Sequence, residues 1–164
     1  FGYPIKQQCN KKTTLTNVDI VISSGTCITR EAYNIVGPFN AGLFIDHVDN
    51  EWCLRCRSKN IPIQVVPHVK MRHRIGNKPK NIGFFTILTH SADRCYYQIR
   101  NSLLLFRIKN IPILYSFKEL TSILFSRLIL LFFVTNKIKY MKHYIQGIRD
   151  GFIGRDGPNR NNLL

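Results

Sequence analysis

The chain has 164 residues, enough for one domain with a hydrophobic core or for a small domain with an appendage. Hydrophobic residues make up 45% of it, which argues against disorder, and its five irregularly spaced cysteines argue against a disulfide scaffold and favour a reducing cytosol. Its 24 Lys and Arg residues against nine Asp and Glu residues give a net charge of +15, which calls for an anionic partner such as nucleic acid, a membrane face or a phosphate-bearing substrate.

The first half of the chain predicts strands alternating with short helices. Apolar residues alternate with other residues over 18–23, which is typical of a strand. Thr29 can cap a short helix that ends at Gly37. A second helix is expected over about 49–60, because Asp is a good N-cap and Asn a tolerable stop. The order therefore favours an α/β arrangement.

Two further strands are predicted before residue 76. Residues 61–66 are typical of a buried strand, and apolar residues alternate with cations over 69–75. On a strand this alternation places His73 on the apolar face, opposite Lys70, Arg72 and Arg74.

The second half predicts helices with a basic surface. A helical pattern over 91–107 is followed by an apolar run over 120–134. This run is shorter than the roughly 20 residues that span a bilayer, and Arg127 interrupts it. It can pack as a core helix or lie in a membrane interface, where Lys118, Arg127 and the nearby Lys137, Lys139 and Lys142 would supply positive charge. Residues 147–164, rich in Gly, Asn and Arg, are predicted to form loops.

The carboxylates of the chain concentrate at one place. Asp46, Asp49 and Glu51 fall within six residues and directly precede Trp52, the only tryptophan. A carboxylate at a helix start can act as a general base towards a sugar hydroxyl. The alternative is a capping role, with Asp49 at the N-cap and Glu51 in the first turn, and spacing alone favours capping.

Two other sets of residues have a chemical and a structural interpretation. His73 can be a hydrogen-bonded core residue, or it can complete a divalent-metal site if its strand meets the acidic helix. Cys53 and Cys56 form a single C-x-x-C within a predicted helix, and no second ligand pair lies at zinc-finger spacing. Buried helix cysteines are the interpretation that this spacing favours.

Several motifs carry a resemblance to a known family. They are Ser-Ser-Gly-Thr at 23–26, Ile-Thr-Arg-Glu-Ala-Tyr at 28–33, Val-Gly-Pro-Phe at 36–39, Leu-Phe-Ile-Asp-His-Val-Asp-Asn-Glu-Trp-Cys-Leu-Arg at 43–55, Val-Val-Pro at 65–67 and His-Arg-Ile-Gly at 73–76. Together they resemble the inverting family-two glycosyltransferases of GT-A fold, in particular the bacterial rhamnosyltransferases of surface polysaccharide synthesis. Tyr96-Tyr97, Arg100-Asn101 and Gly-Ile-Arg-Asp-Gly at 147–151 are similar to the helical tail of that subgroup.

The resemblance implies a fold and a domain organisation. Residues 1–83 would form the acceptor-side, C-terminal part of a GT-A catalytic domain, and residues 84–164 a helical, basic, membrane-proximal appendage. The family's Asp-x-Asp metal motif precedes this region, and residues 1–45 contain none. We therefore expect the chain to be a fragment or truncated product that is inactive alone, and the coding sequence upstream of Phe1 would show whether a donor-binding part precedes it.

The resemblance also implies roles for individual residues. Counting back from Cys-Leu-Arg at 53–55, the family's base falls on Asp49, and the histidine that helps to hold Mg²⁺ or Mn²⁺ falls on His73. Ser24 and Gly25 match the loop that borders sugar and acceptor. Asp46, Glu51 and Trp52, from the same acidic motif, are the remaining candidates for substrate binding.

The function implied is transfer of L-rhamnose from dTDP-rhamnose to a lipid-linked saccharide acceptor, in synthesis of bacterial O-antigen or capsule. The enzyme would lie peripherally on the cytoplasmic face of the inner membrane. Alternatives are a galactofuranosyl or other hexosyl transferase and a non-catalytic, membrane-associated remnant. A nucleic-acid-binding module would also explain the charge. We expect no nucleic-acid partner, because the cations form no single stripe with interleaved aromatics and no known binding motif occurs.

Overall fold

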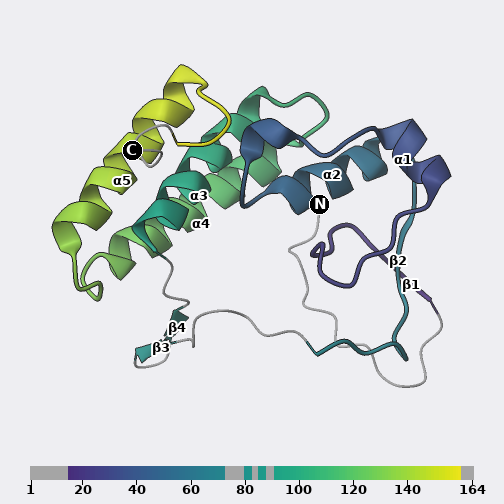
Figure 1. The fold of residues 1–164 in the computed structure, drawn as a ribbon, viewed down its shortest axis with the longest axis horizontal. Coiled ribbons are helices and arrows are strands. Elements are labelled where there is room, and N and C mark those ends of the chain that lie inside the picture. The colour runs from purple at the N-terminus through teal and green to yellow at the C-terminus, as the bar shows by residue number, and fades with distance from the viewer. Residues whose placement is uncertain (1–14, 73–79, 83–84, 88–90, 160–164) are drawn as a thin grey trace.

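A computed structural model describes residues 15–72, 80–82, 85–87 and 91–159 (Figure 1). The described part is mixed α/β but mostly helical. Its helices are α1 (Arg30–Val36), η1 (Ala41–Leu43), α2 (Val48–Ser58), α3 (Ala92–Leu104), η2 (Leu105–Arg107), α4 (Ile113–Leu130) and α5 (Lys137–Ile153). Its strands are β1 (Thr16–Val18), β2 (Ile63–Val65), β3 (Lys80–Ile82) and β4 (Phe85–Ile87).

The strands form two separate antiparallel pairs within the described residues, β1 with β2 and β3 with β4. Val18 pairs with Ile63, and β1 ends there, so the predicted strand over 18–23 is wrong beyond its first residue. The chain turns away at Asp19, whose carboxylate forms an ion pair with Arg57 of α2 at 3.0 Å. That the strands of this chain belong to the sheet of a GT-A domain therefore stays a prediction.

The second predicted strand pair is confirmed only in part. β2 lies within the expected 61–66 strand, but a turn at Pro67 and His68 ends it, closed by a bond from the Val69 N–H to the Val66 carbonyl at 3.3 Å. Residues 69–72 form no strand, contrary to the prediction. His73 lies outside the described residues, so its predicted place on an apolar strand face is not tested.

The two helices before β2 begin and end close to the predicted residues. Thr29 caps α1 by accepting a hydrogen bond from the Ala32 N–H at 3.2 Å, and Gly37, at a φ of 89°, ends the helix. Helix α2 starts at Val48 with His47 as its N-cap, so the prediction of Asp49 as the N-cap is wrong. Asp49 lies instead in the first turn.

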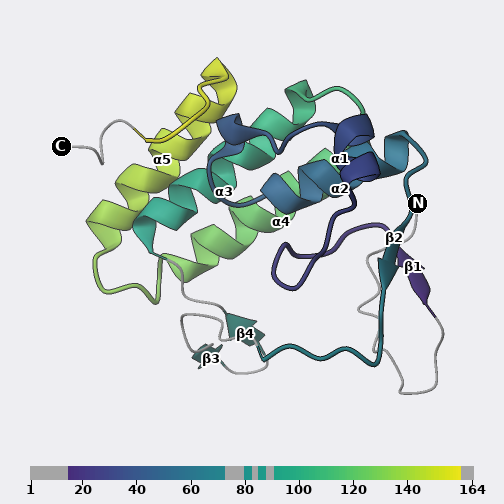
Figure 2. The ribbon, with the colours of Figure 1, turned by 45° about the vertical axis from the view of Figure 1, so that its right-hand side comes forward.

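Helix α3 is the centre of the C-terminal bundle, with α4 and α5 packed against it (Figure 2). Ser91 caps α3, as the predicted helix over 91–107 requires, and its residues from Cys95 to Leu104 are buried. The core formed by α3, α4 and α5 includes Cys95, Ile99, Leu130 and Tyr140.

Helix α5 continues through 147–153, where the sequence predicts loops, so that prediction is wrong there. A Cβ on Gly151 would lie 2.7 Å from Cδ1 of Leu103, and one on Gly147 would lie 2.8 Å from the carbonyl oxygen of Tyr96. The two glycines let α5 approach α3 closely, and this tertiary packing outweighs their low helix propensity.

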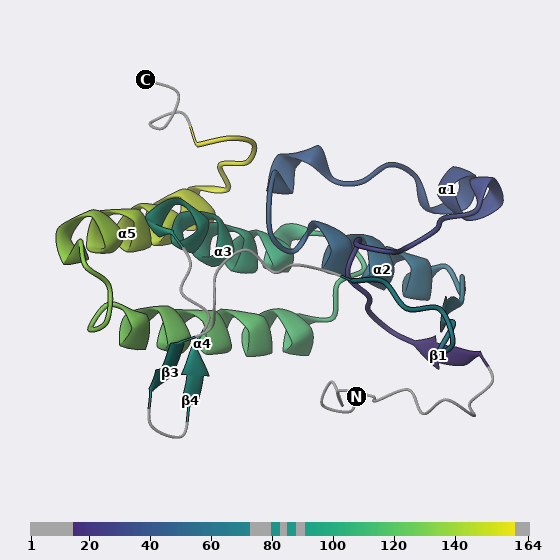
Figure 3. The same ribbon diagram turned by 60° about the horizontal axis from the view of Figure 1, so that its bottom comes forward.

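Helix α4 forms a separate layer below α3 and α5 (Figure 3). Ile123 and Leu124 pack against the core, as the core-helix alternative for the apolar run requires, and the predicted membrane-surface role of the run stays a prediction. Phe117, Phe125 and Leu128 of the same helix are 52%, 68% and 45% exposed, and the ring of Phe117 packs edge-on against that of Phe106 of η2. Among the described residues, no helix combines the length and apolarity that a bilayer crossing needs.

Candidate functional site

The acidic motif borders a cavity of about 640 Å³ between the two halves of the described chain. The walls come from the turn at Ile22 and Ser23, the loop over 44–47, the start of α2, and one side each of α3 and α4. Its polar lining consists of Ser23, Asp46, His47, Asp49, Asn50, Arg94, Gln98 and Glu119. Such a concave surface with converging polar groups is a typical ligand site.

The loop that enters α2 has an unusual backbone. Phe44, Asp46 and His47 have φ angles of 61°, 64° and 62°, in the left-handed region. For residues with a Cβ this conformation costs about 1–2 kcal/mol each. The loop can hold this conformation only if other contacts compensate.

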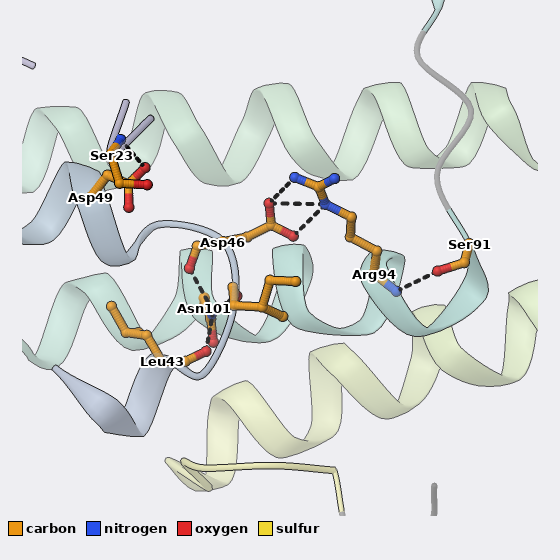
Figure 4. A network of polar contacts seen from close by, with 8 residues as sticks. Ser23, Leu43, Asp46, Asp49, Ser91, Arg94 and Asn101 are labelled. Atoms are coloured by element: carbon orange, nitrogen blue, oxygen red, sulfur yellow. Dashed lines mark hydrogen bonds and ion pairs between the residues drawn. The ribbon is translucent and has the colours of Figure 1, made fainter. Parts of the chain in front are cut away.

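Asn101 of α3 supplies those contacts (Figure 4). Its side-chain amide donates to the carbonyl oxygens of Leu43, Ile45 and Asp46 at 2.9, 2.7 and 3.0 Å. Asn101 is fully buried, so these bonds are not exposed to competition from water. One side chain thereby fixes three carbonyls of the strained loop.

The neighbouring Arg100 fixes Asn101 in turn. Its Nε and Nη2 donate to the Asn101 Oδ1 at 2.9 and 2.8 Å, and Nη2 also donates to the Leu43 carbonyl at 3.0 Å. The guanidinium lies 5.5 Å from the ring centre of Tyr96 and 5.0 Å from that of Tyr97. This buried cation is thus satisfied by carbonyl oxygens and aromatic faces. The Arg100-Asn101 pair therefore connects the helical bundle to the acidic loop.

Asp46 is held by an ion pair across the cavity wall. Arg94 of α3 donates from Nε to both carboxylate oxygens at 3.1 and 3.0 Å, and from Nη2 to Oδ1 at 2.8 Å. The hydrogen bond to Asp46 raises the pKa of the Arg94 guanidinium, which therefore stays charged. Both oxygens of Asp46 are engaged, which suits a role in shaping the wall of the cavity.

Asp49 is a carboxylate of the cavity lining with one oxygen available, and Glu119 of α4 is another lining carboxylate, 3.9 Å from Lys118. Its Oδ2 accepts a hydrogen bond from the Ser23 N–H at 2.9 Å, and Oδ1 has no partner among the described residues (Figure 4). Asp49 lies in the first turn of α2, where the positive end of the helix dipole stabilises a negative charge. A bound hydroxyl could therefore reach an oriented carboxylate.

The other predicted site residues lie beside or behind the cavity. Glu51, 2% exposed, pairs with Arg55 of the same helix at 2.6 Å, and the indole N–H of Trp52 donates to the Gly37 carbonyl at 2.9 Å. Neither lines the cavity. Ser24 and Gly25 form the turn that follows Ser23, with a φ of 78° at Gly25, and they also lie outside the lining.

The predicted metal site has no described counterpart. His73 lies outside the described residues, and within 15–72, 80–82, 85–87 and 91–159 no group of three or more His, Cys, Asp or Glu side chains is close enough to hold a metal ion. The described residues therefore do not by themselves fit the Mg²⁺ or Mn²⁺ that the resemblance implies.

The cysteines of α2 are free and buried, as the spacing predicts. Burial raises the pKa of the Cys53 thiol, and it raises the pKa of the Cys56 thiol to about 11. Both are therefore protonated at neutral pH, where the thiol is a poor nucleophile and metal ligand.

Six polar residues of the cavity lining were not predicted as site residues from the sequence: Ser23, His47, Asn50, Arg94, Gln98 and Glu119. Arg94 and Glu119 come from α3 and α4, and no local pattern connects them to the acidic motif. His47 lies within that motif, but the sequence gives no sign that its backbone is left-handed. Its presence between two acids is the only signal that could have drawn attention to it.

Comparison with known proteins agrees with the glycosyltransferase resemblance. The chain is 41% identical over 143 residues to the dTDP-rhamnosyl transferase RfbF of Shigella flexneri. The aligned region covers 87% of this chain, which spans about half, 48%, of the length of that relative. No family profile matches the sequence. No solved structure matches the chain. By sequence, the chain is thus similar along most of its length to about half of a rhamnosyltransferase.

Proposed function

We propose that this chain is the acceptor-side part of a rhamnosyltransferase that uses dTDP-L-rhamnose. The 41% identity to a dTDP-rhamnosyl transferase carries the proposal. The cavity supports it, because Asp49 stands there with one carboxylate oxygen available. The donor-binding part would have the GT-A fold and precede this chain, as the motif order of the family implies.

In the proposed reaction, Asp49 accepts the proton of the acceptor hydroxyl through Oδ1. The hydroxyl oxygen attacks the anomeric carbon of rhamnose, and the bond from that carbon to the dTDP oxygen breaks. A single in-line displacement inverts the anomeric configuration and needs one base. The Ser23 N–H holds the other oxygen of Asp49 and so keeps the carboxylate oriented.

A divalent cation, Mg²⁺ or Mn²⁺, is part of the proposal for the complete enzyme. Its charge would offset the negative charge that develops on the leaving diphosphate. His73 is the residue of this chain proposed to help hold it. The described residues form no metal site, and we assign no step to the ion.

The donor is tested by product analysis with a full-length enzyme that contains this chain. We expect transfer from dTDP-L-rhamnose to a lipid-linked saccharide with inversion, seen by NMR of the product. Transfer from UDP-galactofuranose instead would identify the galactofuranosyl alternative. Product with a retained anomeric configuration, or no transfer from either donor, would contradict the proposed reaction.

A membrane-surface location at the cytoplasmic face is the second part of the proposal. The outer face of α4 and the following turn expose Leu114, Phe117, Phe125, Leu128 and Phe132. Such an apolar stripe can enter the interface of a bilayer. Lys137, Lys139 and Lys142 follow, and each cation near an anionic surface contributes roughly 1 kcal/mol. Arg127 does not add to this face, because its Nε and Nη1 are buried.

Liposome flotation tests this surface on the chain itself. We expect binding that increases with anionic lipid and decreases with salt. Replacing Phe125 and Phe132 by Ser should lower the bound fraction several-fold, because each exposed ring contributes up to about 2 kcal/mol of transfer free energy. The matched control replaces two exposed apolar residues elsewhere, Ile35 and Val69, by Ser and should bind like wild type. Equal loss in both variants, or no binding at all, would remove the membrane surface from the proposal.

A further inference from the structure

His47 occupies a position that the start of α2 alone does not explain. It is the N-cap residue, yet its side chain makes no capping hydrogen bond. Ser, Thr, Asp and Asn are the residues that cap well, and His at a φ of 62° adds backbone strain. A residue that stands at the N-cap without capping the helix is expected to have another role.

His47 is a lining residue of the cavity, and the hydrogen-bonding capacity of its imidazole is unused. Both Nδ1 and Nε2 are buried, and neither has a hydrogen-bond partner among the described residues. Buried polar atoms are nearly always hydrogen-bonded, and leaving one unpaired is destabilising. Two unpaired nitrogens on one ring at a cavity therefore indicate a missing ligand or bound water.

The electrostatic surroundings favour a neutral ring. Burial lowers the pKa of His47, and the carboxylates of Glu119 and Asp46 oppose this to a smaller extent. A neutral imidazole has one N–H donor and one nitrogen acceptor. Sugar hydroxyls also donate and accept, so a neutral ring can bind one in either direction.

His47 shares the cavity with the proposed base. Asp49 lies two residues further along the chain, and Glu119 of α4 lines the same cavity. Tyr115, one helical turn before Glu119, accepts a hydrogen bond from the Asn50 side chain at 2.8 Å, which holds α4 against α2. A polyhydroxyl ligand in this cavity would thus meet His47, Asp49 and Glu119.

We propose that His47 binds a hydroxyl of the acceptor sugar, beside the hydroxyl that faces Asp49. The inference rests on the proposed function for the identity of the ligand as an acceptor. The recognition itself, of a saccharide by a neutral imidazole, depends only on the cavity. His47 would then contribute to acceptor affinity, with Asp49 contributing to turnover.

The test on the chain itself is an NMR titration of the His47 ring. The probes are methyl α-L-rhamnopyranoside, methyl β-D-glucopyranoside and the methyl glycoside of N-acetylglucosamine, each up to about 100 mM, far above a dissociation constant on the order of 1 mM. We expect saturable shifts of the His47 ring signals with at least one probe, while those of the exposed His68 stay unchanged. Absence of saturable shifts with all three would overturn the proposal.

A substitution separates binding from folding. Asn tolerates a left-handed backbone and caps helices well, so His47→Asn should fold at least as well as wild type. We expect its affinity for the probe to fall about tenfold, the effect of one lost hydrogen bond of about 1.4 kcal/mol. The control His68→Asn should bind as wild type does, and unchanged affinity of His47→Asn would contradict the assignment.

Kinetics on the full-length enzyme distinguish this proposal from the proposed function. His47→Asn should raise KM for the acceptor, with kcat and KM for the donor changed only a few-fold. Loss of kcat with unchanged acceptor KM would count against a binding role. If the glycosides bind through His47 but no rhamnose is transferred, the cavity assignment stands and the proposed reaction fails.

Discussion

Replacing Asp49 by Asn is expected to lower kcat of the full-length enzyme by about 100-fold or more, the typical contribution of a general base. The amide has the shape of the carboxylate, and its oxygen can still accept the Ser23 N–H bond now made at 2.9 Å. It cannot take the proton of the acceptor hydroxyl. Steady-state kinetics with dTDP-L-rhamnose and a lipid-linked acceptor, beside a thermal melt of the same variant, measure the effect.

The matched control for this substitution is Asp19→Asn. Asp19 has the same chemistry, but its side chain is 67% exposed and pairs with Arg57 away from the cavity. Its replacement should leave kcat within a few-fold of wild type. Were Asp49→Asn also to retain wild-type kcat, Asp49 would serve only to hold the Ser23 N–H at the first turn of α2. A fall in kcat together with a lower melting temperature would point to misfolding.

Local signals in the sequence predict both ends of α1 and the start of α3. Thr29, Gly37 and Ser91 act through hydrogen bonds and backbone angles within a few residues, and the structure has all three at helix ends. The strands are predicted less well, because a strand exists only where a partner pairs with it. β1 stops at Val18, since β2 offers no partner beyond Ile63 in that direction.

Helix α5 shows why composition misled the prediction for 147–153. Glycine is unfavourable in an isolated helix by about 1 kcal/mol, so Gly147 and Gly151 suggested a loop. The two glycines are favourable only because α5 packs against α3, where a Cβ at either position would collide with Leu103 or with the backbone of Tyr96. That contact joins segments about fifty residues apart, and no local pattern reports it.

The sequence singled out the acidic residues of the candidate site, but it did not predict which residues of α3 contact them. The motif resemblance pointed to Asp49 and also placed Arg100 and Asn101 in a helical tail, with no role for either. Their hydrogen bonds to the 42–46 loop span more than fifty residues. The ion pair of Asp46 with Arg94 spans 48. Such contacts depend on the packing of α3 beside the loop, which sequence spacing does not contain.

Asn101 is the residue whose loss should destabilise the described structure most clearly. Asn101→Ala removes three buried hydrogen bonds and leaves the carbonyls of Leu43, Ile45 and Asp46 without that donor. Buried unsatisfied groups cost about 1–3 kcal/mol, and Arg100 still covers the first carbonyl, so we expect a loss of about 3 kcal/mol. Denaturant unfolding measures it, and a melting temperature lower by roughly 10 °C should accompany it.

The substitution Asn101→Asp tests whether donation is the essential property. Asp has the same shape and can accept from Arg100, but an ionised carboxylate has no N–H for the three carbonyls and repels their oxygens. We therefore expect Asn101→Asp to be at least as destabilising as Asn101→Ala, whereas the exposed control Asn34→Ala should change stability by about 0.5 kcal/mol or less. Wild-type stability of Asn101→Asp would show that the Arg100 contact alone holds the loop. Because the strained loop carries Asp46 and His47, saccharide shifts of the His47 ring should weaken in both Asn101 variants even at temperatures where they remain folded.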